Sequence, residues 1–299
     1  MPFAKTIPSH AVGVFLALLA ACGFAAKAIF AKLAYRYGVD AITMVTLRLG
    51  LLVPILLLIR WRSMASEPPL NGTQRLWLLI LGLLGYYLSS LLDFIGLETV
   101  SASLERMVLC LYPTLTVLLS SCLHKQRLHP PLIFALALTY GGMGLVLLPD
   151  LGKAHADLMG LLCVLASTIT YALYLTLSPT TIQQIGARRF TELALLVSAA
   201  AMCCHFLLTR SPQLIIEQPW QVWSYACAMA LLSTLFPLYA LSAAMLQIGA
   251  SKAAIIGSLG PILTILFSME LLDEWLSGWQ WLGVLLVIGG VTLTSRKGK

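Results

Sequence analysis

Six charged residues interrupt long apolar stretches of this chain: Lys27, Arg48, Asp93, Glu98, Glu105 and Arg106. If those stretches cross a membrane, each charge costs roughly 2.5–3.5 kcal/mol at a helix centre and must face protein or water. Three cations and three anions suggest mutual pairing. Two interpretations stay open: ion pairs that hold helices together, or direct contact of at least one charge with a polar substrate.

Two polar stripes run along otherwise apolar segments. Tyr86, Ser90 and Asp93 recur at helical spacing, with Leu97 next. The same spacing relates Ser167, Tyr171, Tyr174 and Ser178. Such stripes point toward the interior of a helix bundle, and tyrosine suits a cavity wall, although it is also common at membrane interfaces. The substrate-cavity candidates are Lys27, Arg48, Tyr86, Ser90, Asp93, Glu105, Arg106, Tyr112, Tyr171, Tyr174 and Ser258.

Two prolines lie well inside apolar segments. Pro113 and Pro261 each remove a backbone donor, which frees the carbonyl four residues earlier, at Leu109 and Gly257. Freed carbonyls inside a membrane are tolerated only against protein or a watery cavity. We therefore expect these prolines to act as hinges or site walls, with kinks that serve packing alone as the alternative.

The composition places these residues in a membrane protein. Hydrophobic residues make up 59% of the 299 residues and charged residues 10%, with a mean hydropathy of +0.90. A soluble domain has about 25% charged residues. We predict an all-α integral membrane protein of about ten spans, nine or eleven being possible: 11–33, 41–59, 76–96, 101–123, 132–148, 158–177, 190–208, 222–246, 251–271 and 278–294.

The distribution of Lys and Arg predicts the orientation. With the N-terminus inside, twelve of the 19 fall in inside segments and four at outside ends. Positive charge concentrates on the cytoplasmic side, so both termini are expected in the cytoplasm, with the chain multi-pass in the plasma (inner) membrane. The run ending at Cys22 resembles a lipoprotein signal, but its apolar pattern continues to Leu33, which favours a retained first helix.

The second half repeats the first at an offset of 148 residues. Ala102-Ser103 aligns with Ala250-Ser251, Pro113 with Pro261, and Gly141-Gly142 with Gly289-Gly290. We predict two five-helix repeats, 1–150 and 151–299. An odd number of helices per repeat inverts the second copy in the membrane, the plan of many secondary transporters.

These residues resemble the EamA-type transporters of the drug/metabolite transporter superfamily. The resemblance covers nearly the whole chain and rests on the following residues: Gly23 to Lys27, Arg48-Leu49, Ala102-Ser103, Pro113, Ala250 to Lys252, Gly260-Pro261, Glu274 and Gly289-Gly290. It implies a ten-helix bundle with a central cavity and substrates such as amino acids or bases, often exported. Gln126 stands where the family has an acidic residue, which we interpret as loss of a structural loop contact.

We therefore expect a secondary transporter that exports or exchanges a small polar metabolite by alternating access. A membrane-embedded enzyme acting on lipid-linked substrates, a channel and a sensory membrane subunit are the alternatives. Phosphate-binding loops and metal-binding helix motifs are absent from the sequence, so no enzyme activity, cofactor or metal is expected. The expected partners are the substrate and the lipid bilayer, without nucleic acid; a homodimer stays open. Titratable Asp93 and Glu105 make proton coupling a hypothesis.

Overall fold

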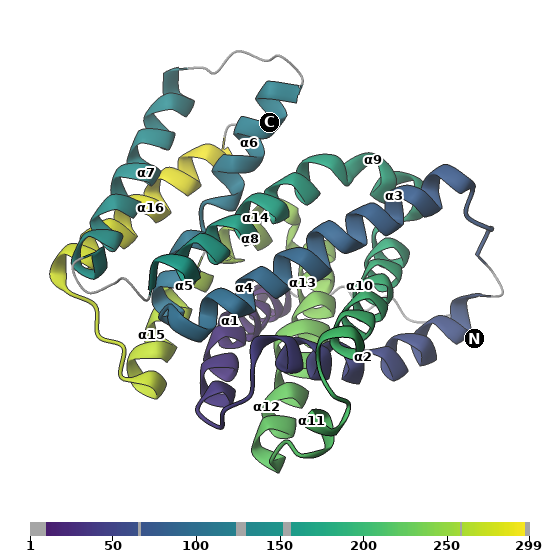
Figure 1. The fold of residues 1–299 in the computed structure, drawn as a ribbon. Helices are drawn as coiled ribbons and strands as arrows, with labels where there is room; N and C mark the ends of the chain where they lie inside the picture. The colour runs from purple at the N-terminus through teal and green to yellow at the C-terminus, as the bar shows by residue number, and fades with distance from the viewer. Residues whose placement is uncertain (1–9, 65–66, 124–129, 152–156, 258, 297–299) are drawn as a thin grey trace.

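The computed structural model describes residues 10–64, 67–123, 130–151, 157–257 and 259–296. The elements assigned there are all helices, which confirms the all-α prediction (Figure 1). Seven helical stretches are long and apolar enough to cross a membrane: Ala11–Tyr35, Ala41–Trp61, Gly72–Thr99, Ala102–Leu123, Leu158–Leu177, Ala187–Thr209 and Trp220–Ile248. Shorter apolar helices at Ile133–Val146, Gly260–Leu272 and Gly278–Gly290 stand where the sequence predicts further spans.

The chain follows this order of elements. The first half contains α1 (His10–Tyr35), α2 (Ala41–Met64), α3 (Gly72–Gly82), the π-helical segment η1 (Leu83–Leu88), α4 (Ser89–Thr99), α5 (Ala102–Leu109), α6 (Tyr112–Leu123) and α7 (Pro130–Leu151). The second half contains α8 (Asp157–Leu177), α9 (Pro179–Ile185), α10 (Ala187–Thr209), α11 (Gln213–Ile216), α12 (Trp220–Ala230), the π-helical η2 (Leu231–Leu235), α13 (Phe236–Ile248), α14 (Ala250–Gly257), α15 (Gly260–Leu272) and α16 (Gly278–Arg296).

The spans that contain Pro113 and Pro261 are interrupted rather than kinked. One span breaks between α5 and α6, and Pro113 is the second residue of α6. Pro261 is likewise the second residue of α15. Proline fits the first turn of a helix because its missing N–H would lack an intrahelical partner there in any event. Each proline therefore lies in the first turn of a helix rather than in the middle of one, and its action as a hinge or site wall stays a prediction.

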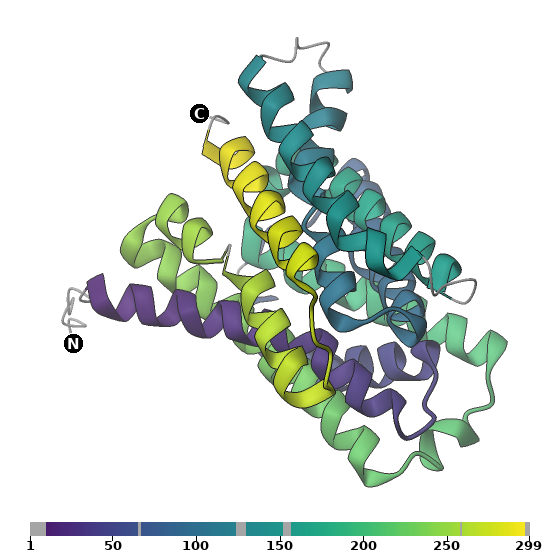
Figure 2. The ribbon, with the colours of Figure 1, turned by 90° about the vertical axis from the view of Figure 1, so that its left-hand side faces the viewer.

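Glycines allow helices from the two halves to approach closely. α7 and α16 lie side by side in both views (Figures 1 and 2). A Cβ atom added to Gly142 would lie 2.7 Å from the carbonyl oxygen of Gly283, and one added to Gly290 would lie 2.7 Å from that of Ala135. Because the higher residue number on one helix meets the lower one on the other, α7 and α16 are antiparallel.

Two further helices of the first half, α1 and α4, pack closely against the second half. α1 packs against α12 and α13, with Gly23 beside Pro237, while α4 packs against α8, with Gly96 beside Gly160. Ser167 Oγ in α8 donates a 2.7 Å hydrogen bond to the carbonyl oxygen of Ser89 in α4. Small residues thus bring backbones together, as is usual where lipid gives no hydrophobic drive for helices to associate.

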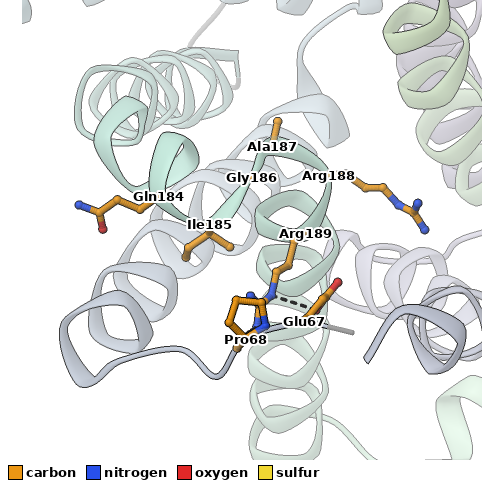
Figure 3. Close-up of a pocket in the computed structure, with 8 residues that line it drawn as sticks. All are labelled: Glu67, Pro68, Gln184, Ile185, Gly186, Ala187, Arg188 and Arg189. Atoms are coloured by element: carbon orange, nitrogen blue, oxygen red, sulfur yellow. Dashed lines mark hydrogen bonds and ion pairs between the residues drawn. The ribbon is translucent and has the colours of Figure 1, made fainter. Parts of the chain in front are cut away.

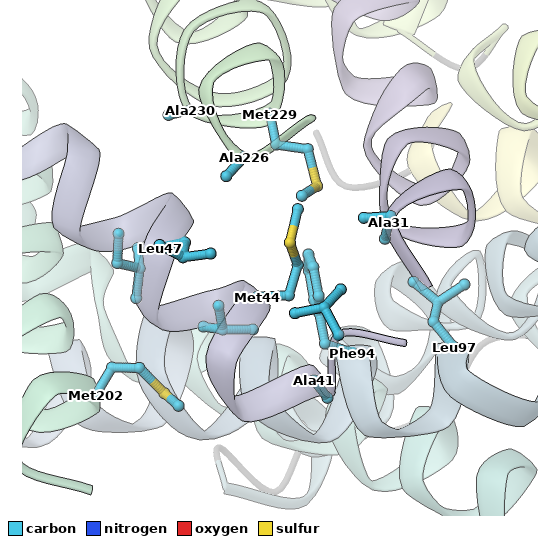
Figure 4. Close-up of a cluster of buried hydrophobic side chains, with 14 of the residues drawn as sticks. Ala31, Ala41, Met44, Leu47, Phe94, Leu97, Met202, Ala226, Met229 and Ala230 are labelled. Atoms are coloured by element: carbon cyan, nitrogen blue, oxygen red, sulfur yellow. The ribbon is translucent and has the colours of Figure 1, made fainter. Parts of the chain in front are cut away.

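The largest apolar cluster lies among α1, α2, α4, α10 and α12. Met44 lies between Met229 and Phe94, and all three side chains are inaccessible to solvent (Figure 4). This cluster joins helices of both halves around one core. Phe94 is also one face of the site described below.

The adjacent glycines Gly141 and Gly142 of α7 give a matched pair of substitutions, because only an added Cβ at Gly142 would meet α16. We expect Gly142→Ala to destabilise the protein by about 1–3 kcal/mol, because the methyl group would meet the backbone of α16. Gly141→Ala places its methyl group where no described atom lies within 4 Å and improves helix propensity, so it should be neutral or stabilising. Thermal unfolding of the purified protein in detergent measures both. Equal unfolding temperatures would contradict this account of the packing.

Candidate functional site

One lysine and two carboxylates meet at the junction of three helices. Lys27 of α1 contacts Asp93 of α4 through a short hydrogen-bonded ion pair, and its Nζ lies 3.1 Å from Oε1 of Glu105 in α5. The Glu105 side chain is fully buried, that of Asp93 is 5% exposed, and that of Lys27 is 19% exposed. One ammonium group thus compensates two carboxylates, and the more accessible partner is the cation.

These charges come together because they lie at similar depths in their helices. At 1.5 Å per residue, Lys27 is about 12 Å from the end of α1 at Tyr35, and Asp93 about 9 Å from the end of α4 at Thr99. Glu105 is about 5 Å from the start of α5 at Ala102. Short turns connect Tyr35 to α2 and Thr99 to α5, and the hydrogen bond from the Ala41 N–H to Glu98 joins the end of α4 to the start of α2, so these ends lie on one face of the bundle.

Arg48 of α2 borders this cluster. Its Nη2 donates a 2.7 Å hydrogen bond to Oγ of Ser90, and its guanidinium lies 4.8 Å from the ring centroid of Phe94. The Nζ of Lys27 lies 5.8 Å from the same centroid. Cation–π contact stabilises a desolvated cation by up to about 2 kcal/mol. The Phe94 ring therefore helps to stabilise both Lys27 and Arg48.

Mutual pairing of the three cations and three anions was wrong in detail. Glu98 accepts a 2.6 Å hydrogen bond from the backbone N–H of Ala41, which places it at the start of α2 rather than on a cation. Among the described residues, no carboxylate lies within the 4.0 Å ion-pair limit of Arg48 or Arg106. The cluster therefore holds three cations against Asp93 and Glu105, one positive charge in excess when all five are ionised.

Arg106 lies where the first half meets the second. Its guanidinium packs against Gly260, where an added Cβ would lie 2.5 Å from Nη2. Gly260 begins α15, and α15 packs against α5, with Ser103 hydrogen-bonded to Ser268. The Nε of Arg106 is buried and has no hydrogen-bond partner in the described part of the chain. The absence of a side chain at Gly260 thus makes room for this guanidinium.

The four tyrosine candidates form one continuous row. Tyr112 contacts Tyr171 edge to face at 5.4 Å between centroids, and Tyr171 stacks on Tyr174 at 5.6 Å. Tyr86 meets Tyr174 edge to face, with 3.2 Å between the hydroxyl oxygens. Tyr174 in turn stacks on Phe190 near the start of α10. The structure thus brings the tyrosines of three spans together, and Ser258 lies outside the described residues.

A second ionic cluster, which the sequence reasoning missed, lies at the opposite helix ends. Arg60 of α2 contacts Glu67 at 2.9 Å and Glu192 of α10 at 3.5 Å, while Arg188 and Arg189 contact Glu192 and Glu67. Beside it lies an open pocket of about 390 Å³ between residue 67 and the start of α10, with Arg189 turned toward Glu67 (Figure 3). Glu192 lies inside the predicted span 190–208, and this buried charge was the signal in the sequence that could have indicated the cluster.

Polar contacts also join the halves at the face of the bundle where α1 and α4 end. Arg210 after α10 forms an ion pair of 3.2 Å with Asp40 before α2. Glu274 accepts hydrogen bonds from the backbone N–H groups of Ala102 and Ser103, at 3.1 and 3.2 Å, and so caps α5. This is a structural loop contact, whereas Gln126, its counterpart, lies outside the described residues. Elsewhere, Nδ1 of His205 in α10 lies 2.8 Å from the hydroxyl oxygen of Tyr87 in η1, within hydrogen-bond distance.

The sharing of Lys27 by two carboxylates predicts unequal effects of substitution. Lys27→Met leaves both buried carboxylates without their cation, and breaking a buried ion pair costs about 3–5 kcal/mol. Asp93→Asn leaves Lys27 paired with Glu105, so it should lower the unfolding temperature less. Thermal unfolding at pH 7 in detergent compares them, and a larger loss in Asp93→Asn would contradict the assignment of Lys27 as the shared cation.

Comparison with known proteins agrees with this architecture. Residues 11–148 and 158–296 each match the model of the EamA-like transporter family. The chain is 31% identical to the Uncharacterized transporter YcbK of Bacillus subtilis (strain 168), over 97% of this chain and 96% of that protein. It is 23% identical to the Uncharacterized transporter YyaM of the same organism, over 73% and 72%.

A protein of known crystal structure has the same fold, with a TM-score of 0.61, 18% identity and coverage of 97% of this chain and 99% of the other. Two family matches that together span nearly the whole sequence, several apolar spans and a relative above 30% identity all agree. The chain is therefore a multi-pass membrane protein that belongs to the EamA-like transporter family.

Proposed function

We propose that this protein is a secondary transporter that exports or exchanges a small polar metabolite, such as an amino acid, by alternating access. The observation that carries the proposal is the buried charge cluster where α1, α4 and α5 of the first half meet α15 of the second. Helix packing alone does not require five charges in a low-dielectric interior, where each is costly. A binding site for a polar molecule within the membrane explains their presence.

Inverted repeats 1–150 and 151–299 form the second part of the proposal. Several features recur 148 residues apart in support of it. The π-helical segments begin at Leu83 and Leu231, and positive-φ glycines stand at Gly38 and Gly186. Contacts recur as well, because Gly142 meets Gly283 while its counterpart Gly290 meets Ala135, the counterpart of Gly283. Such reciprocal contacts are those of a pseudo-twofold axis.

Alternating access requires contacts between the halves that break and form on each face. The cluster around Arg60, Glu67 and Glu192 supplies polar contacts at one face, and the Asp40–Arg210 pair supplies them at the other. The Asp40–Arg210 pair suits this role because water can replace an exposed ion pair at low cost when a face opens. We place the Arg60 face in the cytoplasm, with both termini, because Lys and Arg concentrate there.

Flux into proteoliposomes tests the function. Pools of amino acids, nucleobases and polyamines should include one class with saturable flux, and Arg106→Ala or Asp93→Asn should reduce that flux by tenfold or more, or about 1.4 kcal/mol, while the protein still folds. Non-saturable flux would indicate a channel. Absence of flux from well-folded protein would favour the enzyme or sensory alternative.

A pH gradient across the same vesicles tests coupling. If Asp93 carries a proton during the cycle, accumulation of the transported class should change with the imposed gradient and become insensitive in Asp93→Asn. If Glu105 carries it, the insensitivity should appear in Glu105→Gln instead. Unchanged rate and accumulation in the parent protein would refute proton coupling. An uncoupler that collapses the gradient is the control.

A further inference from the structure

We infer that the transported metabolite is a carboxylate that carries an aromatic ring, with its carboxylate at Arg106 and its ring against Tyr112 and Tyr171. This inference rests on the proposed transport function and names its substrate class. Two observations support it: Arg106 forms no ion pair within the described residues, and the tyrosine row begins six residues after it on the same span.

The charge at Arg106 requires a partner. Lys27 takes both carboxylates of the cluster, and Arg106 has neither an ion pair nor a hydrogen bond at Nε within the described residues. Guanidinium presents a fork of donors that fits a carboxylate by two parallel hydrogen bonds. An anion bound here would remove the one excess positive charge of the cluster.

The surroundings of Arg106 also favour an anion. Gly260 and Pro261 form the first turn of α15, a 13-residue helix whose N-cap residue, Leu259, offers no side-chain cap. The partial positive charge of a helix N-terminus thus lies against the guanidinium through the Gly260 contact. Two positive groups in contact repel each other unless a negative group lies between or beside them.

The tyrosine row supplies a surface for a flat ring. Tyr112 lies six residues after Arg106 on the same span, beyond the end of α5 and at the start of α6. Tyr112 is 37% exposed, so its ring is not consumed by packing. Aromatic pairs stabilise contact beyond simple burial. From Tyr112 the row continues through Tyr171 and Tyr174 to Phe190 at the opposite face.

A cationic substrate is the competing possibility, since an amine could displace Lys27 from Asp93 and Glu105. The probes separate the two. Isothermal titration of the purified parent protein compares phenylacetate, phenylalanine, cyclohexylacetate and phenethylamine. We expect the two aromatic carboxylates to bind, cyclohexylacetate to bind more weakly, and phenethylamine not to bind. Phenethylamine binding that depends on Asp93 would overturn the inference and leave the transport proposal intact.

Matched variants place the carboxylate. Arg106→Gln should weaken phenylacetate binding by about tenfold or more. Gly260→Ala should weaken it too, because the methyl group displaces the flexible end of Arg106 and leaves the fold in place. Gly257→Ala is the control, since no described atom lies within 4 Å of its added Cβ. If Gly260→Ala and Gly257→Ala bind phenylacetate equally, the carboxylate is not at Arg106.

Tyr112→Leu tests the ring separately. It should weaken phenylacetate binding a few-fold and leave cyclohexylacetate binding unchanged, because only the aromatic ligand gains from ring contact. Equal loss for both ligands would refute the aromatic part of the inference. Failure of transport is measured independently in the flux assay, where absence of flux for every pool would refute the proposed function itself.

Discussion

The cost of placing charge in a hydrocarbon environment constrains the rest of this structure. Lys27 stands between Asp93 and Glu105, and this arrangement holds α1, α4 and α5 at fixed depth and rotation, because a displaced helix would leave a buried carboxylate alone. The helices around it are apolar toward lipid and carry small residues toward one another. Glycine contacts between α7 and α16, and between α1 and α13, make the close approach possible.

The interruptions of the helices have the same physical origin. A continuous α-helix satisfies its own backbone groups, so a break inside the membrane is tolerated only where protein or water faces it. The breaks between α5 and α6, and before α15, lie on the two spans that meet at Arg106 and Gly260. Helix ends from both halves thus lie next to Arg106, which forms no ion pair within the described residues. This combination supports the proposed binding site.

The amino-acid sequence predicts the helices well and their interactions less well. Apolar runs place the spans within a few residues because hydrophobic thickness constrains their length. Pairing is different, since it depends on depth and rotation that no local pattern encodes. Glu98 lies close in sequence to Asp93 yet caps α2, while Glu192 pairs with Arg60 from 132 residues away. The π-helical segments likewise depend on tertiary contacts, such as the fit of Gly85 against Tyr174.

The charged residues of the proposed site do not recur in the second half of the chain. The helix contacts of the two halves correspond, but positions 148 residues after Lys27, Asp93, Glu105 and Arg106 hold Leu175, Leu241, Ala253 and Ala254. The charged wall therefore comes from the first half, whereas Tyr171, Tyr174 and Gly260 come from the second. A ligand between these surfaces would touch both halves with different chemistry. Relative movement of the halves would then change its charged contacts and its aromatic contacts separately, which is the condition for binding to differ between two conformations.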